Sequence, residues 1–266
     1  MLSHPETGRS LTQYLGLTLR ETSEPGAAHP TIEGDLARLD HMRAANGNVR
    51  AGALLTAADS SAGLCGGLAV LPGWVVTTNI MLHITSFEHV GPLRTCARVL
   101  RTGKKAVVTA MHIIDLGRDN ALIADGVLTS AVLHPEGGPP NYPRPLVIDA
   151  STHDSWTTEE LPDFLAVRTD GPSRLSIELN DRLRNPWGIL HGGAIAALVD
   201  VAAEHTTGGV TTDVVLHFLA PGRVGPVAAT VEPIGTRPDG TVVRVEIRDS
   251  GADNRLIAIS VVTCRA

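Results

Sequence analysis

Two halves of this chain repeat one another, and the repeat limits the possible folds more than any other feature. VTTNIMLHI at 76–84 matches VTTDVVLHF at 210–218, HVGP at 89–92 matches RVGP at 223–226, and DNALIA at 119–124 matches DNRLIA at 253–258. These three pairs keep one constant spacing, which chance similarity would not produce. The sequence therefore predicts a duplicated unit of roughly 130 residues, and two copies form a domain pair rather than a solenoid.

Each half contains one long segment of small apolar residues, AGALLTAADSSAGL at 51–64 and GGAIAALVDVAAEH at 192–205. Both segments are too long for a typical strand and lack proline, so we expect two buried helices. Shorter segments rich in β-branched residues lie around them, separated by Gly, Pro and Asp turns. The expected strands include 31–39, 174–179, 210–219, 227–233, 241–248 and 256–264. One helix and about five strands per half predict an α+β fold with a sheet wrapped round each helix.

Composition marks the boundary between the two copies. The sequence HPEGGPPNYPRP at 134–145 is crowded with proline and glycine, which excludes a helix or a central strand. We therefore expect an N-terminal unit at 1–134, a linker at 135–145 and a C-terminal unit at 146–266. LTQYLGL at 11–17 is similar to LPDFLAV at 161–167, so a short helix is expected near the start of each unit.

Composition and charge argue against several classes of protein. The net charge of −6 disfavours a nucleic-acid partner, which would call for a basic face. No apolar run reaches the ~18 residues that span a bilayer, and MLSHPETGRS at the start lacks the apolar core of a signal peptide. The three cysteines have no paired spacing and indicate reduced thiols. We expect a cytoplasmic protein with no membrane partner and no metal site.

The second apolar segment carries a motif. Asn185 is followed by His191-Gly192-Gly193, then by Asp200 about two helical turns later, and then by Thr211 at the start of the next strand. This order resembles the hotdog-fold acyl-CoA thioesterases of the phenylacetyl-CoA thioesterase (PaaI-like) type. The resemblance covers essentially the whole C-terminal half.

The N-terminal half keeps only part of this motif. Asp59 and Thr77 stand where Asp200 and Thr211 do, but Arg50-Ala51-Gly52 replaces His-Gly-Gly. Asn46 is a loose match for the asparagine, in a turn that reads as slightly shorter. The two halves are therefore expected to be unequal in function.

The resemblance implies both a fold and a reaction. It implies two tandem hotdog folds that form a pseudo-dimer within one chain, and a homodimer of that chain. The implied reaction is hydrolysis of acyl-CoA thioesters to the free acid and coenzyme A. No cofactor is implied, since coenzyme A is part of the substrate. An aspartate would act as a general base on water or as a nucleophile that forms an anhydride, and the sequence does not separate the two.

Physical chemistry gives the same residues a rationale. The first N–H groups of a helix lack internal partners and lie at the positive end of its dipole. Glycine at 192 lets a thioester carbonyl approach that N–H closely, which would stabilise the oxyanion. The alternative is that the Gly-Gly pair only permits close packing of the helix. A carboxylate within an apolar helix is costly unless it has a function there or reaches solvent. For both Asp59 and Asp200, the sequence allows either a functional carboxylate or one that points to solvent.

Distance along the helix predicts a composite site. Gly192 and Asp200 lie about 12 Å apart at 1.5 Å per residue, so one carbonyl cannot contact both. If the two helices are antiparallel, Gly192 and Asn185 face Asp59 and Thr77 of the other half. The second site would then combine Arg50 and Ala51 with Asp200 and Thr211. His191 shapes the turn before Gly192, and either threonine hydrogen-bonds water or is an ordinary strand residue.

Other functions are also open at this point. A non-catalytic hotdog protein that binds acyl-CoA as a sensor or scaffold would fit the degraded half. A hydratase or dehydratase would need a His–Asp or His–Glu pair within a signature that is missing here. We expect His83, His217 and Glu204 to be structural. Arg174, Arg182, Arg184 and Arg223 are candidates for the coenzyme A phosphates, but the sequence does not choose among them.

Overall fold

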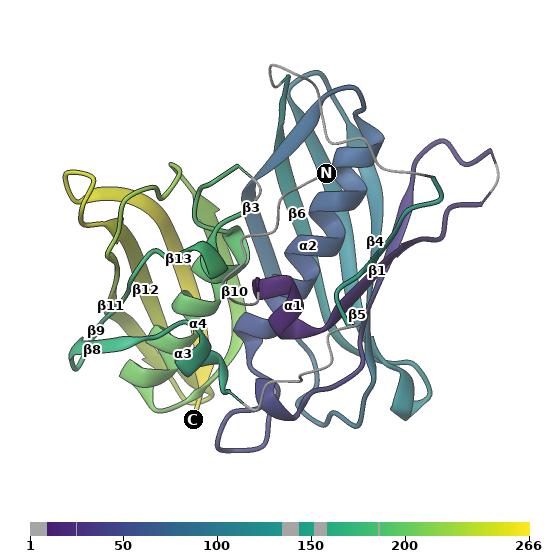
Figure 1. The fold of residues 1–266 in the computed structure, drawn as a ribbon. Helices are drawn as coiled ribbons and strands as arrows, with labels where there is room; N and C mark the ends of the chain where they lie inside the picture. Colours follow the sequence, from purple (N-terminus) through teal and green to yellow (C-terminus); the bar gives the residue numbers. More distant parts are fainter. Residues whose placement is uncertain (1–9, 25, 135–143, 152–158, 186) are drawn as a thin grey trace.

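The computed structural model describes residues 10–266 except 25, 135–143, 152–158 and 186. Most of the expected linker at 135–145 therefore lies outside the described residues. Two long helices occupy the middle of the molecule, and strands surround them (Figure 1). The helices are α2 (Ala51–Ala69) and α4 (Gly192–Thr207), so both predicted helices are confirmed, with α2 extending five residues past the segment read from the sequence.

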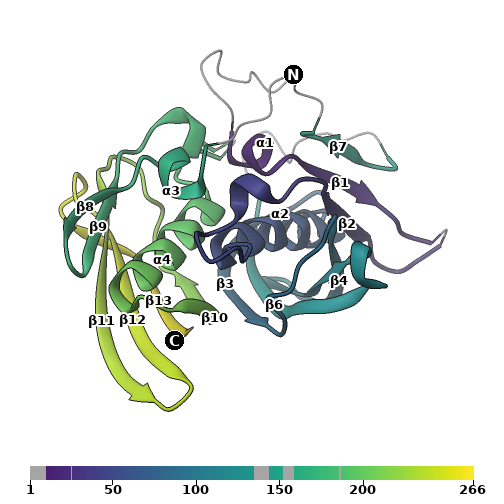
Figure 2. The same ribbon diagram turned by 90° about the horizontal axis from the view of Figure 1, so that it is seen from below.

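The helices form because their residues are small, apolar and suited to burial. His191 caps the start of α4 by accepting the Gly193 N–H at 2.9 Å, and Gly208 ends the helix in the left-handed conformation that favours glycine. The two helices are antiparallel and lie side by side (Figure 2). A methyl group on Gly52 would lie 2.7 Å from Cα of Ala197, so the backbones approach too closely there for a larger residue.

The strands form one continuous antiparallel sheet that spans both halves. Its order is β7-β1-β2-β4-β5-β6-β3-β10-β13-β12-β11-β9-β8. The strands of the N-terminal half are β1 (Leu17–Glu21), β2 (Thr31–Leu36), β3 (Trp74–Ile84), β4 (Leu93–Thr102), β5 (Ala106–Asp115) and β6 (Ala121–Leu133). Those of the C-terminal half are β8 (Arg168–Gly171), β9 (Arg174–Ile177), β10 (Val210–Phe218), β11 (Val227–Arg237), β12 (Gly240–Asp249) and β13 (Arg255–Arg265).

The two halves meet where β3 pairs with β10. Leu216 of β10 lies opposite Ile80 of β3, and both side chains are fully buried. Each half of the sheet curves round its own helix (Figures 1 and 2). The shared sheet predicted from the repeat is therefore confirmed.

The repeated motifs outside the helices are turns held by buried carboxylates. Asp115 accepts the N–H groups of Val90 and Gly91 at 2.7 and 2.9 Å. Asp249 does the same for Val224 and Gly225, at 3.0 and 2.8 Å. The Asp-Asn pairs at 119–120 and 253–254 all have positive φ, a conformation that these two residue types tolerate better than most others. The repeat thus preserves turn geometry.

Short elements complete the fold. The predicted short helices are confirmed as α1 (Leu11–Leu15) and α3 (Leu161–Phe164). They meet between the halves, where the rings of Tyr14 and Phe164 lie 4.2 Å apart. Three 3-10 turns are η1 (Asp40–Met42), η2 (Leu116–Arg118) and η3 (Asp181–Leu183).

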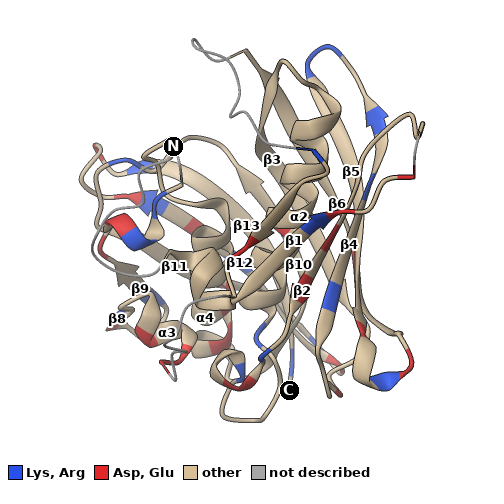
Figure 3. Cartoon of the chain, turned by 45° about the vertical axis from the view of Figure 1, so that its right-hand side comes forward, with Lys and Arg blue, Asp and Glu red and all other residues tan. Residues whose placement is uncertain are grey.

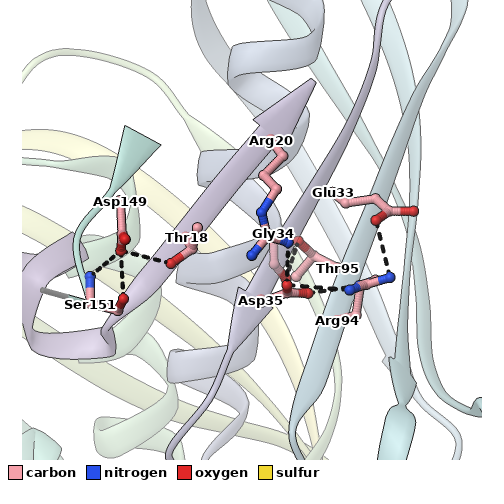
Figure 4. Close-up of polar contacts among 9 residues, drawn as sticks. All are labelled: Thr18, Arg20, Glu33, Gly34, Asp35, Arg94, Thr95, Asp149 and Ser151. Atoms are coloured by element: carbon pink, nitrogen blue, oxygen red, sulfur yellow. Dashed lines mark hydrogen bonds and ion pairs between the residues drawn. The ribbon is translucent and has the colours of Figure 1, made fainter. Parts of the chain in front are cut away.

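Strand β7 (Val147–Asp149) crosses the expected domain boundary. It follows the linker in sequence, yet it pairs with β1 at the edge of the N-terminal half. Figure 4 shows how this edge is held: Asp149 accepts a hydrogen bond from Thr18 at 2.9 Å, and Asp35 of β2 binds Arg94 of β4. The unit boundaries at 134 and 146 stay a prediction. Strand β7 lies after the linker in sequence but belongs to the part of the sheet formed by the first unit.

Most charged residues lie on the outside of this architecture, with Asp115, Asp200 and Asp249 among the buried exceptions. Acidic and basic segments are interspersed over the outer strands and loops, while the two central helices carry few of them (Figure 3). Within the described part of the chain, no helix combines the length and apolarity that crossing a membrane requires.

Candidate active site

A cavity of about 600 Å³ opens at the junction of the two halves. Its wall includes Asp59 of α2, the start of β3, the loop after β10, Asn185, and residues 189–192 at the start of α4. Trp74, Trp187 and Phe218 also line it. The chain has only eight Phe, Trp and Tyr residues, so this cavity holds an unusual share of its large rings.

Asp59 enters the cavity from the N-terminal half. Its Oδ1 accepts the hydroxyl hydrogen of Thr77 at 2.8 Å. Burial raises the pKa of Asp59 above its usual value, and the charge of His191 and the Thr77 hydrogen bond oppose that rise. Only Oδ1 is held by Thr77, so Oδ2 stays available to a substrate or a water molecule.

Gly192 faces Asp59 from the other half. A methyl group on Gly192 would lie 3.1 Å from Oδ2 of Asp59 and 3.5 Å from the ring of Phe218. The Gly192 N–H has no hydrogen-bond partner among the described residues. It is one of the unpaired groups at the positive end of α4, and it lies at the cavity wall.

His191 completes the start of the helix. Its Nδ1 accepts the Gly193 N–H, so the neutral ring carries its proton on Nε2. Burial lowers the pKa of His191, and the charge of Asp59 opposes that effect. The geometry thus leaves Nε2 as the hydrogen-bond donor of this ring.

Asn185 shapes the loop before the helix. Its Oδ1 accepts the N–H groups of Trp187 and Ile189 at 3.0 and 3.3 Å. Its amide nitrogen Nδ2 has no partner in the described part of the chain, and the residue lines the cavity. Nδ2 is therefore a second available donor near Gly192.

The two glycines of the motif have different roles. A methyl group on Gly193 would lie 2.4 Å from Cγ2 of Thr56 on α2, so Gly193 permits the close packing of the helices. Gly192 instead borders the cavity. The packing reading therefore holds for Gly193, and the oxyanion reading stays a prediction for Gly192.

The second pseudo-site is closed. Asp200 has no exposed surface, and its Oδ2 accepts the Gly52 N–H at 2.9 Å. Burial raises the pKa of Asp200, against the hydrogen bonds from Gly52 and Thr211 and the charge of Arg50. Arg50 stands at the position of His191, but its guanidinium binds Glu204 at 2.7 Å. Both aspartates thus sit opposite a helix start, but Asp200 is fully buried, whereas Asp59 lines the 600 Å³ cavity.

The loop hydrogen bonds identify the true counterpart of Asn185. The N–H of Ala44 donates to the Asn48 oxygen at 2.8 Å, just as the N–H of Asn185 donates to Ile189 at 2.8 Å. The expected shorter turn is therefore wrong, since both turns have the same length. Ala44, rather than Asn46, aligns with Asn185, so the second site lacks this amide.

The sequence predicts a structural role for Glu204, and its environment in the fold is unusual. Burial and the charge of Asp200 raise the pKa of Glu204 to about 8, although Arg50 and the Thr211 N–H oppose the shift. In the sequence, its partner Arg50 stands out only because it replaces the histidine of the motif. The single sequence contains no pattern that pairs Arg50 with Glu204, because the two residues belong to different halves.

His83 and His217 are not among the residues that line the cavity. His83 binds Asp213 at 2.7 Å, and His217 contacts Asn79 at 3.1 Å, both across the β3–β10 seam on the outer face. Among the described residues, no group of three or more His, Cys, Asp or Glu side chains is placed to hold a metal ion.

Comparison with known proteins supports a thioesterase relationship. Residues 183–265 match the family model of the acyl-CoA thioesterase N-terminal domain. A protein of Saccharolobus solfataricus provisionally named an esterase is 29% identical over 125 residues, which is 43% of this chain and 82% of that protein.

Solved structures match nearly the whole chain. A provisionally named thioesterase II of Thermobifida fusca has a TM-score of 0.57 at 18% identity, covering 89% of this chain and 93% of that one. The tesB protein of Mycobacterium avium subs paratuberculosis has a TM-score of 0.58 at 12% identity, covering 96% and 97%. At these identities the likeness shows the fold alone, and the fold is a double hotdog. The functional comparison rests on residues 183–265, which match at the level of the acyl-CoA thioesterases, and none of these matches supports the narrower phenylacetyl-CoA type.

Proposed function

We propose that this protein hydrolyses acyl-CoA thioesters in one composite site. The observation that carries the proposal is the Asp59 carboxylate facing the unpaired Gly192 N–H across the wall of a 600 Å³ cavity. Each half supplies one part, so neither half is sufficient alone. The match of residues 183–265 to the acyl-CoA thioesterase family supports this choice of substrate.

The site residues have complementary tasks in this reaction. The Gly192 N–H and Nδ2 of Asn185 bind the thioester oxygen and stabilise the negative charge that develops on it. Thr77 orients Asp59 through Oδ1, which directs Oδ2 toward the carbonyl carbon or a water molecule. The C–S bond breaks when the tetrahedral intermediate collapses, and the thiolate of coenzyme A leaves and takes up a proton.

Asp59 can act in two ways, and the proposal keeps both. As a general base, Oδ2 removes a proton from the attacking water, and the raised pKa makes that transfer more favourable. As a nucleophile, Oδ2 bonds to the acyl carbon and forms an anhydride that water then cleaves. Label found in Asp59 after a single turnover in ¹⁸O-labelled water would identify the anhydride route with water attack on the Asp59 carbonyl carbon, because the general-base route cannot leave it there.

The second pseudo-site does not contribute to catalysis in this proposal. Asp200 and Thr211 keep the identity of a catalytic pair, but both are fully buried. The Arg50–Glu204 pair replaces the histidine cap, and Ala44 replaces the asparagine. The chain therefore provides one working site per two hotdog units.

The test is a thiol-release assay over a panel of acyl-CoAs that includes phenylacetyl-CoA and straight-chain acyl groups. Hydrolysis of at least one member above the background rate supports the proposal, and a preference for phenylacetyl-CoA would support the narrower PaaI-like type. Binding of acyl-CoA without any hydrolysis would favour the sensor or scaffold role instead.

We also propose that the chain is a cytoplasmic homodimer. Four apolar residues form a row across the outer face of the sheet at the seam: Val127, Met81, Val215 and Val261. Val261 is 42% exposed, and a second copy packed on this row would cover it. Light scattering is expected to give the dimer mass, and Val261→Glu is expected to give the monomer. A monomer mass for the parent at micromolar concentration would count against it.

A further inference from the structure

The cavity wall contains two charged side chains with distinct chemistry. One is Asp59, and the other is Arg223 in the loop after β10. The rest of the wall is mostly apolar, as with Trp187 and Leu219. In the described part of the chain Arg223 forms no ion pair, and its residue is exposed. The cavity thus has a carboxylate and a free cation.

The backbone of Arg223 is fixed even though its side chain is free. Its N–H donates to Oδ2 of Asp249 at 2.7 Å. Its carbonyl oxygen accepts from both terminal nitrogens of Arg184 at 3.4 Å. Asp249 is fully buried, so the loop has a firm base. The guanidinium therefore extends from a defined point at the cavity.

The other half shows that this cation is not required by the fold. His89 occupies the equivalent position in the repeat. Arg43 donates to its carbonyl oxygen at 3.2 Å, as Arg184 does to Arg223. The His89 ring is half-buried, and its Nε2 contacts the Ser86 oxygen at 2.9 Å. The loop architecture is shared, and the free cation belongs only to the half with the open cavity.

The other three candidate arginines are either engaged in contacts with the protein or placed outside the cavity wall. Arg182 binds Glu159 at 2.9 Å and lies 4.2 Å from the centre of the Phe164 ring. Arg184 ties the Asn185 loop to the Arg223 loop. Arg174 is on β9, outside the cavity wall. Geometry therefore selects one arginine where the sequence left four.

We propose that Arg223 binds a phosphate group of coenzyme A while the thioester lies between Gly192 and Asp59. This inference rests on the proposed function. A guanidinium presents a planar fork of donors that matches the oxygens of a phosphate, and among the described residues no carboxylate forms an ion pair with that of Arg223. The contact acts on substrate binding, whereas Asp59 and Gly192 act on the thioester itself.

The experiment compares Arg223→Ala with Arg174→Ala, which also removes one exposed arginine but lies outside the cavity wall. Each variant is assayed with an acyl-CoA and with the same acyl group on pantetheine, which lacks the phosphates. Arg223→Ala is expected to raise KM for acyl-CoA about tenfold, with little change in kcat and no change for the pantetheine thioester. Arg174→Ala is expected to leave both unchanged, and added salt should reduce the difference between parent and Arg223→Ala.

Several results would overturn the inference. KM for acyl-CoA unchanged in Arg223→Ala would do so, as would an equal loss on the pantetheine thioester. A loss confined to succinyl-CoA, with butyryl-CoA unaffected, would assign Arg223 to an acyl carboxylate instead. If the parent cleaves no thioester, the proposed function fails separately. Calorimetric titration with coenzyme A then decides, and an unchanged Kd in Arg223→Ala would refute phosphate binding.

Discussion

Replacing Gly192 with alanine should abolish most activity without unfolding the protein. The new methyl carbon would lie 3.1 Å from Oδ2 of Asp59, in the space where the thioester carbonyl must reach the Gly192 N–H. Removing one oxyanion donor typically costs 10²–10³-fold in kcat, and we expect about 10²-fold or more in kcat/KM. Stability should change by less than about 1 kcal/mol, because alanine favours a helix over glycine. Ala51 already occupies the equivalent position in the other half.

The matched control for this prediction is Gly193→Ala, one residue along. Its methyl would lie 2.4 Å from Cγ2 of Thr56, so the two helices must separate, at a cost of about 1–3 kcal/mol. The assays are thiol release and thermal unfolding on both variants. Gly192→Ala should lose activity at a nearly unchanged Tm, and Gly193→Ala should lower Tm. Near-parental kcat/KM in Gly192→Ala would refute the assignment of this N–H to the substrate.

Two further variants test the electrostatics. Thr77→Val removes a hydrogen bond that lowers the pKa of Asp59, so the acid limb of the kcat/KM profile should move to higher pH; a move to lower pH would contradict this. Burial and Asp200 raise the pKa of Glu204 to about 8, so between its ordinary value and about 8 the folded state holds a proton that the unfolded state has lost. Stability should therefore fall as pH rises through that window, and Glu204→Gln should flatten the fall in Tm; an unchanged slope would show that other groups produce it.

The sequence predicted much of the fold because the composition of each segment is a local signal and because the repeat can be read directly by comparing the two halves. The segments at 51–64 and 192–205 became α2 and α4, and the seam strands were readable from their matched motifs. Strand β7 was missed, because three residues next to a proline-rich segment carry no alternation to detect. Its pairing with β1 depends on contacts distant in sequence.

The candidate site was partly predictable for a geometric reason. Antiparallel helices bring the start of one next to the middle of the other, and the structure brings Asp59 and Thr77 to Gly192 as that argument requires. The closure of the second site could be predicted from the sequence only in part. Arg50 could be seen as a substitution, but its bond to Glu204 joins residues 154 apart. The choice of Arg223 likewise needed the cavity wall, which no single-sequence pattern describes.

The central claim is that Asp59, rather than Asp200, serves the working site. The most direct measurement is kcat for a cleaved acyl-CoA in Asp59→Asn and Asp200→Asn, with Tm recorded for both. Loss of an acid–base group typically costs 10²–10⁴-fold, and we predict a loss of this size for Asp59→Asn. Asp200→Asn should retain most activity, because Asp200 is fully buried behind the Arg50–Glu204 pair. An inactive, folded Asp200→Asn beside a near-normal Asp59→Asn would contradict the composite site.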